Sequence, residues 1–498
     1  MKFSRAGGVL LHPSSLAGRY GIGDLGPQAY RFVDWLVSTG CKLWQVLPLG
    51  PTGYGDSPYQ CFSAFAGNPY LISFDGLIED GLLTQEDFSD MPVFKASNVD
   101  FGLLIPWKLS LLQKAFSRLP SAQEGFRREF ERFTTDNASW LDDYALFMSI
   151  KEANGGGAWS EWDEPIRKRK KSAMDKARIE HAENALRHSF YQFLFFRQWN
   201  KLRLYAHERG ITIIGDIPIF IAYDSADAWA NPKLFFLDEE SLPTVLAGVP
   251  PDYFSATGQL WGNPLYKWSA HRKTGYQWWI ERFRSVLHQV DIVRLDHFRG
   301  FAGYYEIPFG SPTAEQGRWV TGPGKDFFQA IYPALSGEEG ETLPIIAEDL
   351  GVITPDVVDL RESFHLPGMK ILQFGFSGAD NPFLPHNYTS NCVAYTGTHD
   401  NDTVRGWHET APEHERDFAH RYLGTSGSDI AWDMIRSVWS SVAVYSVAPM
   451  QDVLDLGGEA RMNFPSTLGG NWEWRMGDGD LSESLAGRLR EMNELYLR

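Results

Sequence analysis

A short apolar strand ends in charged side chains at Val293-Arg-Leu-Asp-His-Phe-Arg-Gly300. Successive side chains of a strand point to opposite faces, so Val293 and Leu295 are expected on one face and Arg294 and Asp296 on the other. Charged groups on an apolar strand are costly to bury unless they are paired or lie at the mouth of a barrel. This segment therefore predicts a buried strand whose C-terminal end carries a polar site.

Seven other short runs have the same apolar character. They are residues 8–12, 42–47, 211–216, 343–348, 369–374, 393–396 and 442–447. Between the first two, Pro27 suits the first turn of a helix and Gly40 suits its C-cap, so these strands should form a parallel pair. Eight such strands are the number that closes a (β/α)₈ barrel, although the count alone does not distinguish a barrel from an open sheet. The acidic residues at the strand ends, described below, favour the barrel. The sequence thus predicts the α/β class and a (β/α)₈ TIM barrel with large helical insertions.

The length of 498 residues allows two or three domains or one large barrel. Because the strands are spread along the whole chain, we expect residues 1–498 to form a single catalytic barrel. Helical and polar segments between the strands are expected to be insertions, at residues 51–205 and 225–285, that form subdomains of this barrel.

Composition excludes several classes of protein. The 46 Lys and Arg against 63 Asp and Glu give a formal charge of −17, which argues against binding to nucleic acid. Three dispersed cysteines exclude a disulfide framework and a thiolate zinc cluster. No signal peptide or membrane-spanning run is recognisable, so we expect a cytoplasmic protein. The 18 tryptophans fit either an aromatic core or stacking against sugars.

Two further strands end in acidic side chains. Glu348 follows the strand at 343–348, and His399 and Asp400 follow the strand at 393–396. Active sites of barrels lie at the C-terminal ends of the strands, so these groups and Asp296 are expected close together. Paired carboxyl groups suit glycosidic chemistry, in which one attacks the anomeric carbon and the other protonates the leaving oxygen. Arg294 would hold the attacking carboxylate ionised.

These acidic residues have two other interpretations. A single acidic strand end is more often part of a structural ion pair, although three of them favour a site. A divalent metal site is disfavoured because His12, His297 and His399 lie on separate segments without ligand spacing. The prediction is a site without a metal or an organic cofactor.

The ordered motifs of the chain resemble the amylomaltases, which are the 4-α-glucanotransferases of glycoside hydrolase family 77. The matching segments are His12–Leu16, Trp44–Gln60, Phe62–Pro69, Gly215–Pro218, Asp224–Asp227, Gly248–Pro264, Arg294–Phe301, Ala347–Gly351, Thr398–Asn401 and Gly470–Trp472. The resemblance runs nearly from end to end. It implies transfer of α-1,4-glucan segments by a retaining double displacement, giving disproportionation and cyclisation.

The resemblance also implies roles for individual residues. Asp296 would be the nucleophile, Glu348 the acid/base, and Asp400 a group that binds the hydroxyls of the reacting sugar. His399 and Arg294 would assist, and Tyr59 and Asp216 would line the donor pocket. A loop that folds over the cleft, and a second glucan-binding surface, would comprise the following residues: Tyr253, Phe254, Gln259, Trp261 and Asn263 for the loop, and Tyr54 for the surface.

The implied partners are α-1,4-glucans such as maltooligosaccharides, amylose and glycogen, with no nucleic acid or membrane. Two alternatives stay open at this point. A retaining α-glucan hydrolase shares the same chemistry, and a non-catalytic glycan-binding barrel shares the same fold. In a transferase a sugar hydroxyl resolves the covalent intermediate, and in a hydrolase water does so. A non-catalytic barrel forms no such intermediate.

Two positions depart from the family pattern. Arg461-Met-Asn-Phe-Pro-Ser466 has serine where the family usually has glycine, and Cys61 replaces a usual serine close to Tyr59. Neither is one of the predicted catalytic acids. We expect such changes to influence acceptor preference or product size.

Overall fold

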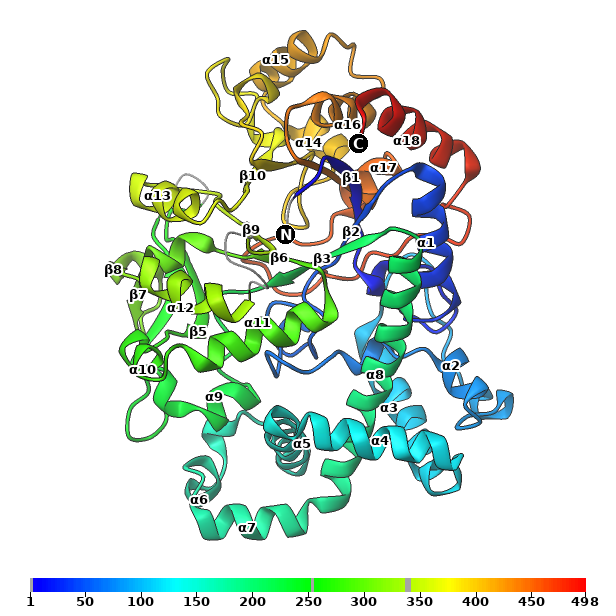
Figure 1. Cartoon of the computed structure of the whole chain (residues 1–498), viewed down its shortest axis with the longest axis vertical. Coiled ribbons are helices and arrows are strands. Elements are labelled where there is room, and N and C mark those ends of the chain that lie inside the picture. Colours follow the sequence, from blue (N-terminus) through cyan, green and yellow to red (C-terminus); the bar gives the residue numbers. More distant parts are fainter. Residues whose placement is uncertain (1–2, 252–254, 336–341) are drawn as a thin grey trace.

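Eight parallel strands form the centre of the structure (Figure 1). The structure is a computed structural model that describes residues 3–251, 255–335 and 342–498. The central strands are β1 (Ala6–Leu10), β2 (Leu43–Gln45), β3 (Thr212–Ile217), β6 (Ile292–Leu295), β9 (Ile345–Ala347), β10 (Gly368–Ile371), β11 (Cys392–Tyr395) and β12 (Tyr445–Pro449). They follow one another around the sheet in chain order, and β12 pairs with β1. The Ala347 amide donates to the Pro367 carbonyl at 2.9 Å, which nearly closes the sheet between β9 and β10. The predicted (β/α)₈ fold class is confirmed.

Helices connect and cover these strands. Helix α1 (Pro27–Thr39) begins at Pro27 and ends at Gly40, whose φ of 76° is the left-handed C-cap that glycine favours. Helix α18 (Glu483–Tyr496) packs on α1, and Asn493 donates to the Thr39 carbonyl at 2.8 Å. Between residue 325 and α18, the described residues form α12 (Lys325–Leu335), α13 (Pro355–Ser363), α14 (Val404–Thr410), α15 (Glu413–Leu423), α16 (Ile430–Ser440) and α17 (Met450–Val453). Between β10 and β11, where every residue is described, the chain forms two 3₁₀ turns rather than an α-helix.

The longest connection lies between β2 and β3, in the lower part of Figure 1. It is helical, as expected, and comprises α2 (Phe74–Glu79), α3 (Phe101–Ser117), α4 (Glu124–Asp136), α5 (Ala138–Ala153), α6 (Glu164–Arg167), α7 (Lys171–Glu180) and α8 (Ala182–Glu208). Helix α8 leads directly into β3. The insertion bounds 51–205 and 225–285 stay a prediction.

A second, antiparallel sheet lies beside the barrel. It joins two strands from the connection between β3 and β6 to two strands that follow β6, in the order β5-β4-β7-β8. The elements are α9 (Ala226–Ala230), β4 (Val245–Val249), β5 (Gln259–Pro264), α10 (Trp268–Lys273), α11 (Gln277–Gln289), β7 (Gly303–Pro308) and β8 (Arg318–Thr321). The apolar pattern does not predict this sheet, because β8 is largely exposed and lacks a buried face.

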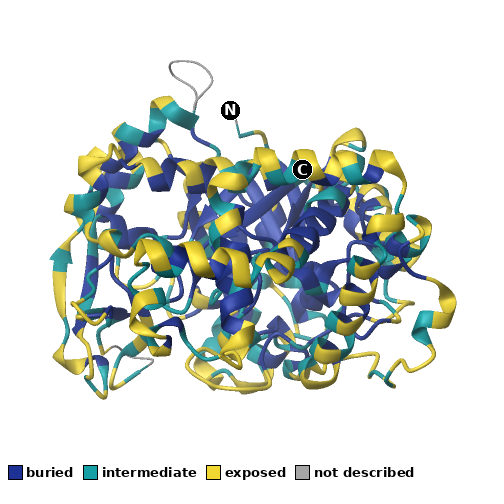
Figure 2. Ribbon diagram, turned by 90° about the horizontal axis from the view of Figure 1, so that it is seen from below, coloured by how far each residue is buried: buried dark blue, intermediate teal, exposed yellow. Residues whose placement is uncertain are grey.

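The barrel interior explains why a site forms at one end. An inner cluster takes apolar side chains from all eight strands, including Ile214, Ile292 and Ile346. Because side chains two residues apart share a face, Asp216, Arg294 and Glu348 continue this inward-facing row beyond the apolar layer. Figure 2 shows the buried strands at the centre and exposed helices around them. The apolar layer thus forms the floor on which the charged groups lie.

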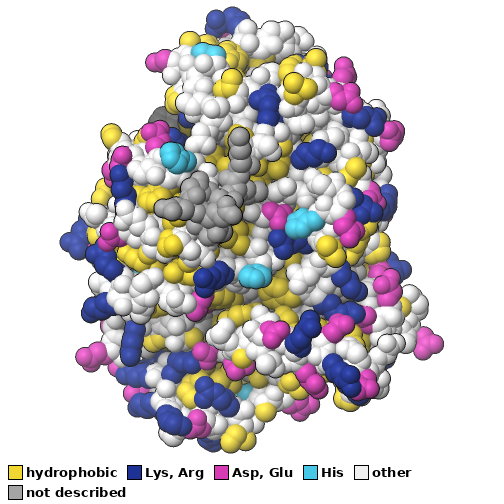
Figure 3. Space-filling view, in the orientation of Figure 1, with side chains coloured by type: hydrophobic (Ala, Val, Ile, Leu, Met, Phe, Trp, Pro, Cys, Tyr) yellow, Lys and Arg dark blue, Asp and Glu magenta, His cyan; other side chains and the backbone are white. Residues whose placement is uncertain are grey.

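Aromatic residues mostly build the core. Twelve of the 18 tryptophans are buried, which favours the core explanation for most of them. On the face shown in Figure 3, acidic and basic side chains of the described residues are interspersed. Within the described ranges, no helix is both long and apolar enough to span a bilayer.

Candidate active site

A buried arginine joins two carboxylates at the ends of β3 and β6. Arg294 Nη1 donates to Asp216 Oδ2 at 2.7 Å and forms an ion pair with Asp296, with its Nη1 2.9 Å from Asp296 Oδ1. The strand register that pairs Asp216 with Arg294 brings these groups together. The Asp216 side chain is fully buried, whereas 28% of the Asp296 side chain is exposed. Asp296 is therefore the carboxylate of this group that a ligand can reach.

Glu348 lies at the end of the neighbouring strand β9 in a different environment. Its Oε2 accepts from the His297 amide at 2.7 Å, and its Oε1 accepts from the Leu350 amide at 2.8 Å. His297 has a φ of 49°, a left-handed conformation that is uncommon outside glycine. Burial, and then the nearby Asp296, raise the pKa of Glu348 to about 8 despite these amides and Arg294. Glu348 therefore carries a proton at neutral pH.

Asp400 follows β11 and is held by groups from a distant segment. Asn463 Nδ2 donates to Asp400 Oδ1 at 2.7 Å, and Arg461 Nη2 donates to the Asp400 carbonyl at 2.7 Å. Partial removal from water would raise the pKa of Asp400, but His399, 3.4 Å away, and Asn463 outweigh it and lower this pKa. The side chain is 48% exposed, so Asp400 is an ionised, accessible carboxylate.

Aromatic rings line the space between these carboxyl groups. Tyr59 donates to Asp216 Oδ2 at 2.9 Å, and its ring stacks on His399 with centroids 4.9 Å apart. The Trp472 ring lies 5.8 Å from both of these rings. Tyr59, Asp216, Arg294, Asp296, His399 and Asp400 thus belong to one connected cluster, as the sequence predicts.

The predicted loop residues are only partly at this cluster. The Trp261 ring contacts the His297 ring edge to face, with centroids 4.9 Å apart, and Trp261 donates to Gln259 Oε1 at 3.0 Å. Trp261 and Gln259 therefore lie beside His297, whose amide donates to Glu348. Asn263 is buried, donates to the Ile221 carbonyl and accepts from Gln60. Tyr253 and Phe254 lie outside the described residues. Tyr54 is 71% exposed in a short turn, away from the contacts of this cluster.

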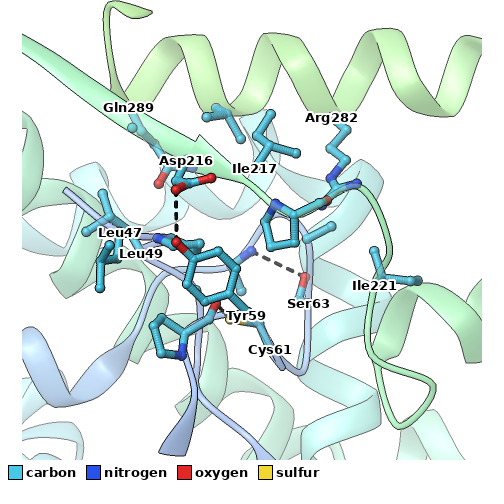
Figure 4. A pocket seen from close by; sticks show the side chains of 18 of the residues that line it. Leu47, Leu49, Tyr59, Cys61, Ser63, Asp216, Ile217, Ile221, Arg282 and Gln289 are labelled. Atoms are coloured by element: carbon cyan, nitrogen blue, oxygen red, sulfur yellow. Dashed lines mark hydrogen bonds between the residues drawn. The ribbon is translucent and has the colours of Figure 1, made fainter. Parts of the chain in front are cut away.

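A pocket adjoins the cluster behind Tyr59 and Asp216 (Figure 4). Its lining includes Cys61, Arg282 and Gln289 but none of Asp296, Glu348 and Asp400. Cys61 Sγ lies 3.0 Å from the Pro58 carbonyl oxygen. Cys61, one of the two departures from the family pattern, therefore lines the same pocket as Tyr59.

Several residues of the cluster are absent from the sequence prediction. Arg461, Asn463 and Trp472 reach the site from the segment after β12. The quoted motif at 461–466 contained two of them, but nothing in its local pattern linked them to Asp400. Ser466, the departure from glycine, has a φ of 65°, which explains why glycine is usual there.

Comparison with known proteins agrees with this geometry. Residues 11–480 match the sequence model of a protein family described as 4-alpha-glucanotransferase. The chain belongs to the 4-alpha-glucanotransferase family. The family member of Thermus thermophilus is 52% identical over 99% of both chains, and that of Synechocystis is 49% identical over 99% of this chain and 98% of its own. The solved amylomaltase of Streptococcus agalactiae in complex with acarbose has a TM-score of 0.95 at 41% identity, covering 99% of each chain.

The fold is also found in a more distant amylomaltase. The amylomaltase of Corynebacterium glutamicum is only 19% identical but has a TM-score of 0.77 over 99% of this chain and 74% of its own. This likeness shows that the barrel persists at low identity. The family membership makes this chain an enzyme of glucan transfer and disfavours both a hydrolase and a non-catalytic barrel.

Proposed function

We propose that this chain transfers α-1,4-glucan segments from a donor to an acceptor glucan by a retaining mechanism in which Asp296 and Glu348 react. The observation that carries the proposal is the contrast between the two carboxyl groups. The Asp296 side chain forms an ion pair with Arg294 and is 28% exposed, whereas Glu348 is buried on the next strand and its pKa is raised to about 8. An accessible carboxylate beside a protonated carboxyl group suits a nucleophile and an acid.

The first half-reaction forms a covalent intermediate. A carboxylate oxygen of Asp296 attacks the anomeric carbon, and the glycosidic bond breaks as Glu348 gives its proton to the leaving 4-oxygen. In the second half-reaction the ionised Glu348 takes the proton of the acceptor's 4-hydroxyl, whose oxygen displaces Asp296. For retention we expect the two carboxyl groups to lie about 5–5.5 Å apart in the glucan complex.

The surrounding residues support the charge that develops on the sugar. Asp400 would bind hydroxyls of the reacting sugar, and its negative charge would stabilise the oxocarbenium-like transition state. Tyr59, Asp216 and His399 would form the wall of the donor pocket. Gln259, Trp261 and Asn263, with Tyr253 and Phe254, would exclude water so that a sugar resolves the intermediate. Tyr54 would belong to a separate glucan-binding surface.

We also propose the glucans, the domain organisation and the location of this chain. Maltooligosaccharides, amylose and glycogen are the proposed glucans. The single-barrel organisation with insertions at 51–205 and 225–285, and a cytoplasmic location, are also proposals. We propose no metal or organic cofactor, because the two carboxyl groups supply both the nucleophile and the proton.

Maltotriose alone should give a ladder of longer glucans plus glucose, with the number of reducing ends constant. Transfer exchanges one glycosidic bond for another, whereas hydrolysis adds a reducing end for each bond cleaved. Chromatography of the products and a reducing-end assay measure both quantities on one sample. A steady rise in reducing ends without longer products would reject transfer in favour of the hydrolase.

The pH dependence should report the proton on Glu348. The acid form is present below its pKa of about 8 and is lost above it, so kcat/KM for the donor should fall as pH rises through this value. Because one proton is involved, the fall should be about tenfold per pH unit. Initial rates with maltotriose from pH 5 to 10 measure it. A kcat/KM that already falls between pH 5 and 6 would contradict a protonated Glu348.

A further inference from the structure

The Arg461–Trp472 segment is fastened to the site at both ends. Near its start, Arg461 and Asn463 donate to the carbonyl and the carboxylate of Asp400, each at 2.7 Å. At its end, the Trp472 ring packs against Tyr59 and His399. The residues between these anchors are therefore held beside the sugar-binding carboxylate.

Phe464 is an aromatic residue of this segment that is not buried in the core. It is 44% exposed, and the Arg461 guanidinium lies 4.2 Å from its ring centroid. The same guanidinium donates to the Asp400 carbonyl, so one side chain links the ring to Asp400. Arg461 covers one face of the ring, which leaves ring surface open to the solvent.

The backbone around Phe464 is fixed. The Phe464 amide donates to Asn471 Oδ1 at 2.9 Å, and Thr467 Oγ1 donates to the Phe464 carbonyl at 2.7 Å. Ser466 makes the turn between them in the left-handed conformation. Arg461 Nε also donates to the Asn463 carbonyl at 2.8 Å. Because these hydrogen bonds hold the turn, a ligand that contacts the Phe464 ring costs the protein little conformational entropy.

An exposed aromatic ring next to a ligand site favours a ligand with an apolar face. Glucose units of an α-glucan present C–H faces and no charge, so they can stack on a phenyl ring already covered on its other side by a cation. A charged ligand would instead meet Arg461 and Asp400 of opposite sign within the same small area. The observations thus favour a neutral sugar on this ring.

We propose that Phe464 is a stacking platform for a glucose unit that lies farther along the glucan than maltotriose reaches from the unit bound at Asp400, so that this chain favours longer glucans. The proposal rests on the proposed function, because it places a glucan in the cleft. It assigns the aromatic side chain at position 464 a role in selecting chain length.

The test compares kcat/KM for maltotriose, maltopentaose and maltoheptaose in the wild type and in Phe464→Ala. We expect the ratio of kcat/KM for maltoheptaose to that for maltotriose to fall about fivefold, as loss of one aromatic contact implies. Phe464→Trp should keep the ratio of the wild type. Leu468→Ala, a matched control at a 73% exposed apolar residue of the same segment, should also keep it.

Other outcomes would overturn the platform. An equal loss of kcat/KM for all three glucans would mean that Phe464 only supports the Asp400 loop through Arg461. An unchanged ratio in Phe464→Ala would mean that no sugar stacks on the ring. If the wild type hydrolysed maltotriose instead of transferring it, the proposed function would fail, yet the length ratio measured from hydrolysis would still decide the platform.

Discussion

Asp296→Asn is expected to lower kcat for glucan transfer roughly 10⁴-fold or more, because the amide cannot attack the anomeric carbon. Arg294 remains bonded to Asp216 in this variant, so the buried cation keeps a partner and the fold should persist. Glucan binding should therefore remain. Glucose release from maltotriose measures kcat, and calorimetric titration with maltoheptaose measures binding.

Two further variants sharpen this experiment. Asp380→Asn makes the same chemical change at an exposed position and should keep full activity. Asp296→Ala supplied with azide and α-glucosyl fluoride should form β-glucosyl azide, because azide enters from the side that Asp296 leaves open. Asp296→Asn with more than about a tenth of the wild-type kcat would show that another group is the nucleophile.

Glu348→Gln is expected to lower kcat on maltotriose about 10²- to 10⁴-fold, because the amide cannot protonate the leaving oxygen. Glu348 is already neutral at pH 7, so a neutral amide of similar shape adds no buried charge. The His297 and Leu350 amides can donate to at most one amide oxygen of glutamine, so a modest loss of stability is expected. Steady-state kinetics and thermal unfolding measure the two effects. Glu239→Gln, at an exposed position, is the matched control.

A donor whose leaving group needs no proton distinguishes acid catalysis by Glu348 from a structural role of Glu348. Fluoride leaves without a proton, so α-glucosyl fluoride should restore formation of the intermediate in Glu348→Gln. Azide needs no general base, and it should then release α-glucosyl azide, the anomer opposite to that expected from Asp296→Ala. A variant equally slow with maltotriose and with α-glucosyl fluoride plus azide would remove Glu348 from the acid/base role.

Much of the central site was accessible from local patterns. The alternation in Val293–Asp296 predicts an apolar face and a charged face, and the structure places Val293 and Leu295 in the core and Arg294 against two carboxylates. Acidic ends of separate strands could be grouped because all parallel strands of a barrel end on the same side. Grouping these acids requires only that the strands are parallel and belong to one barrel.

Contacts made by a distant segment could not be predicted in this way. Asn463 and Asp400 are joined at 2.7 Å, although 63 positions separate them. The antiparallel sheet is similar, because β4 finds its partner β7 only after the chain has passed through β6. Neither pairing can be predicted from a periodic pattern of apolar residues, because each depends on where a loop crosses the barrel.

The order of apolar and charged residues therefore predicted the barrel, the end at which the acidic side chains gather and the acids that we propose to react. Only the tertiary structure decided the surroundings of these acids, because burial and neighbouring charges depend on packing rather than on residue type. Asp296 and Glu348 are both carboxylic acids, yet one faces Arg294 and the other is buried beside a negative charge. That difference, which makes one a candidate nucleophile and the other a candidate acid, arises from packing.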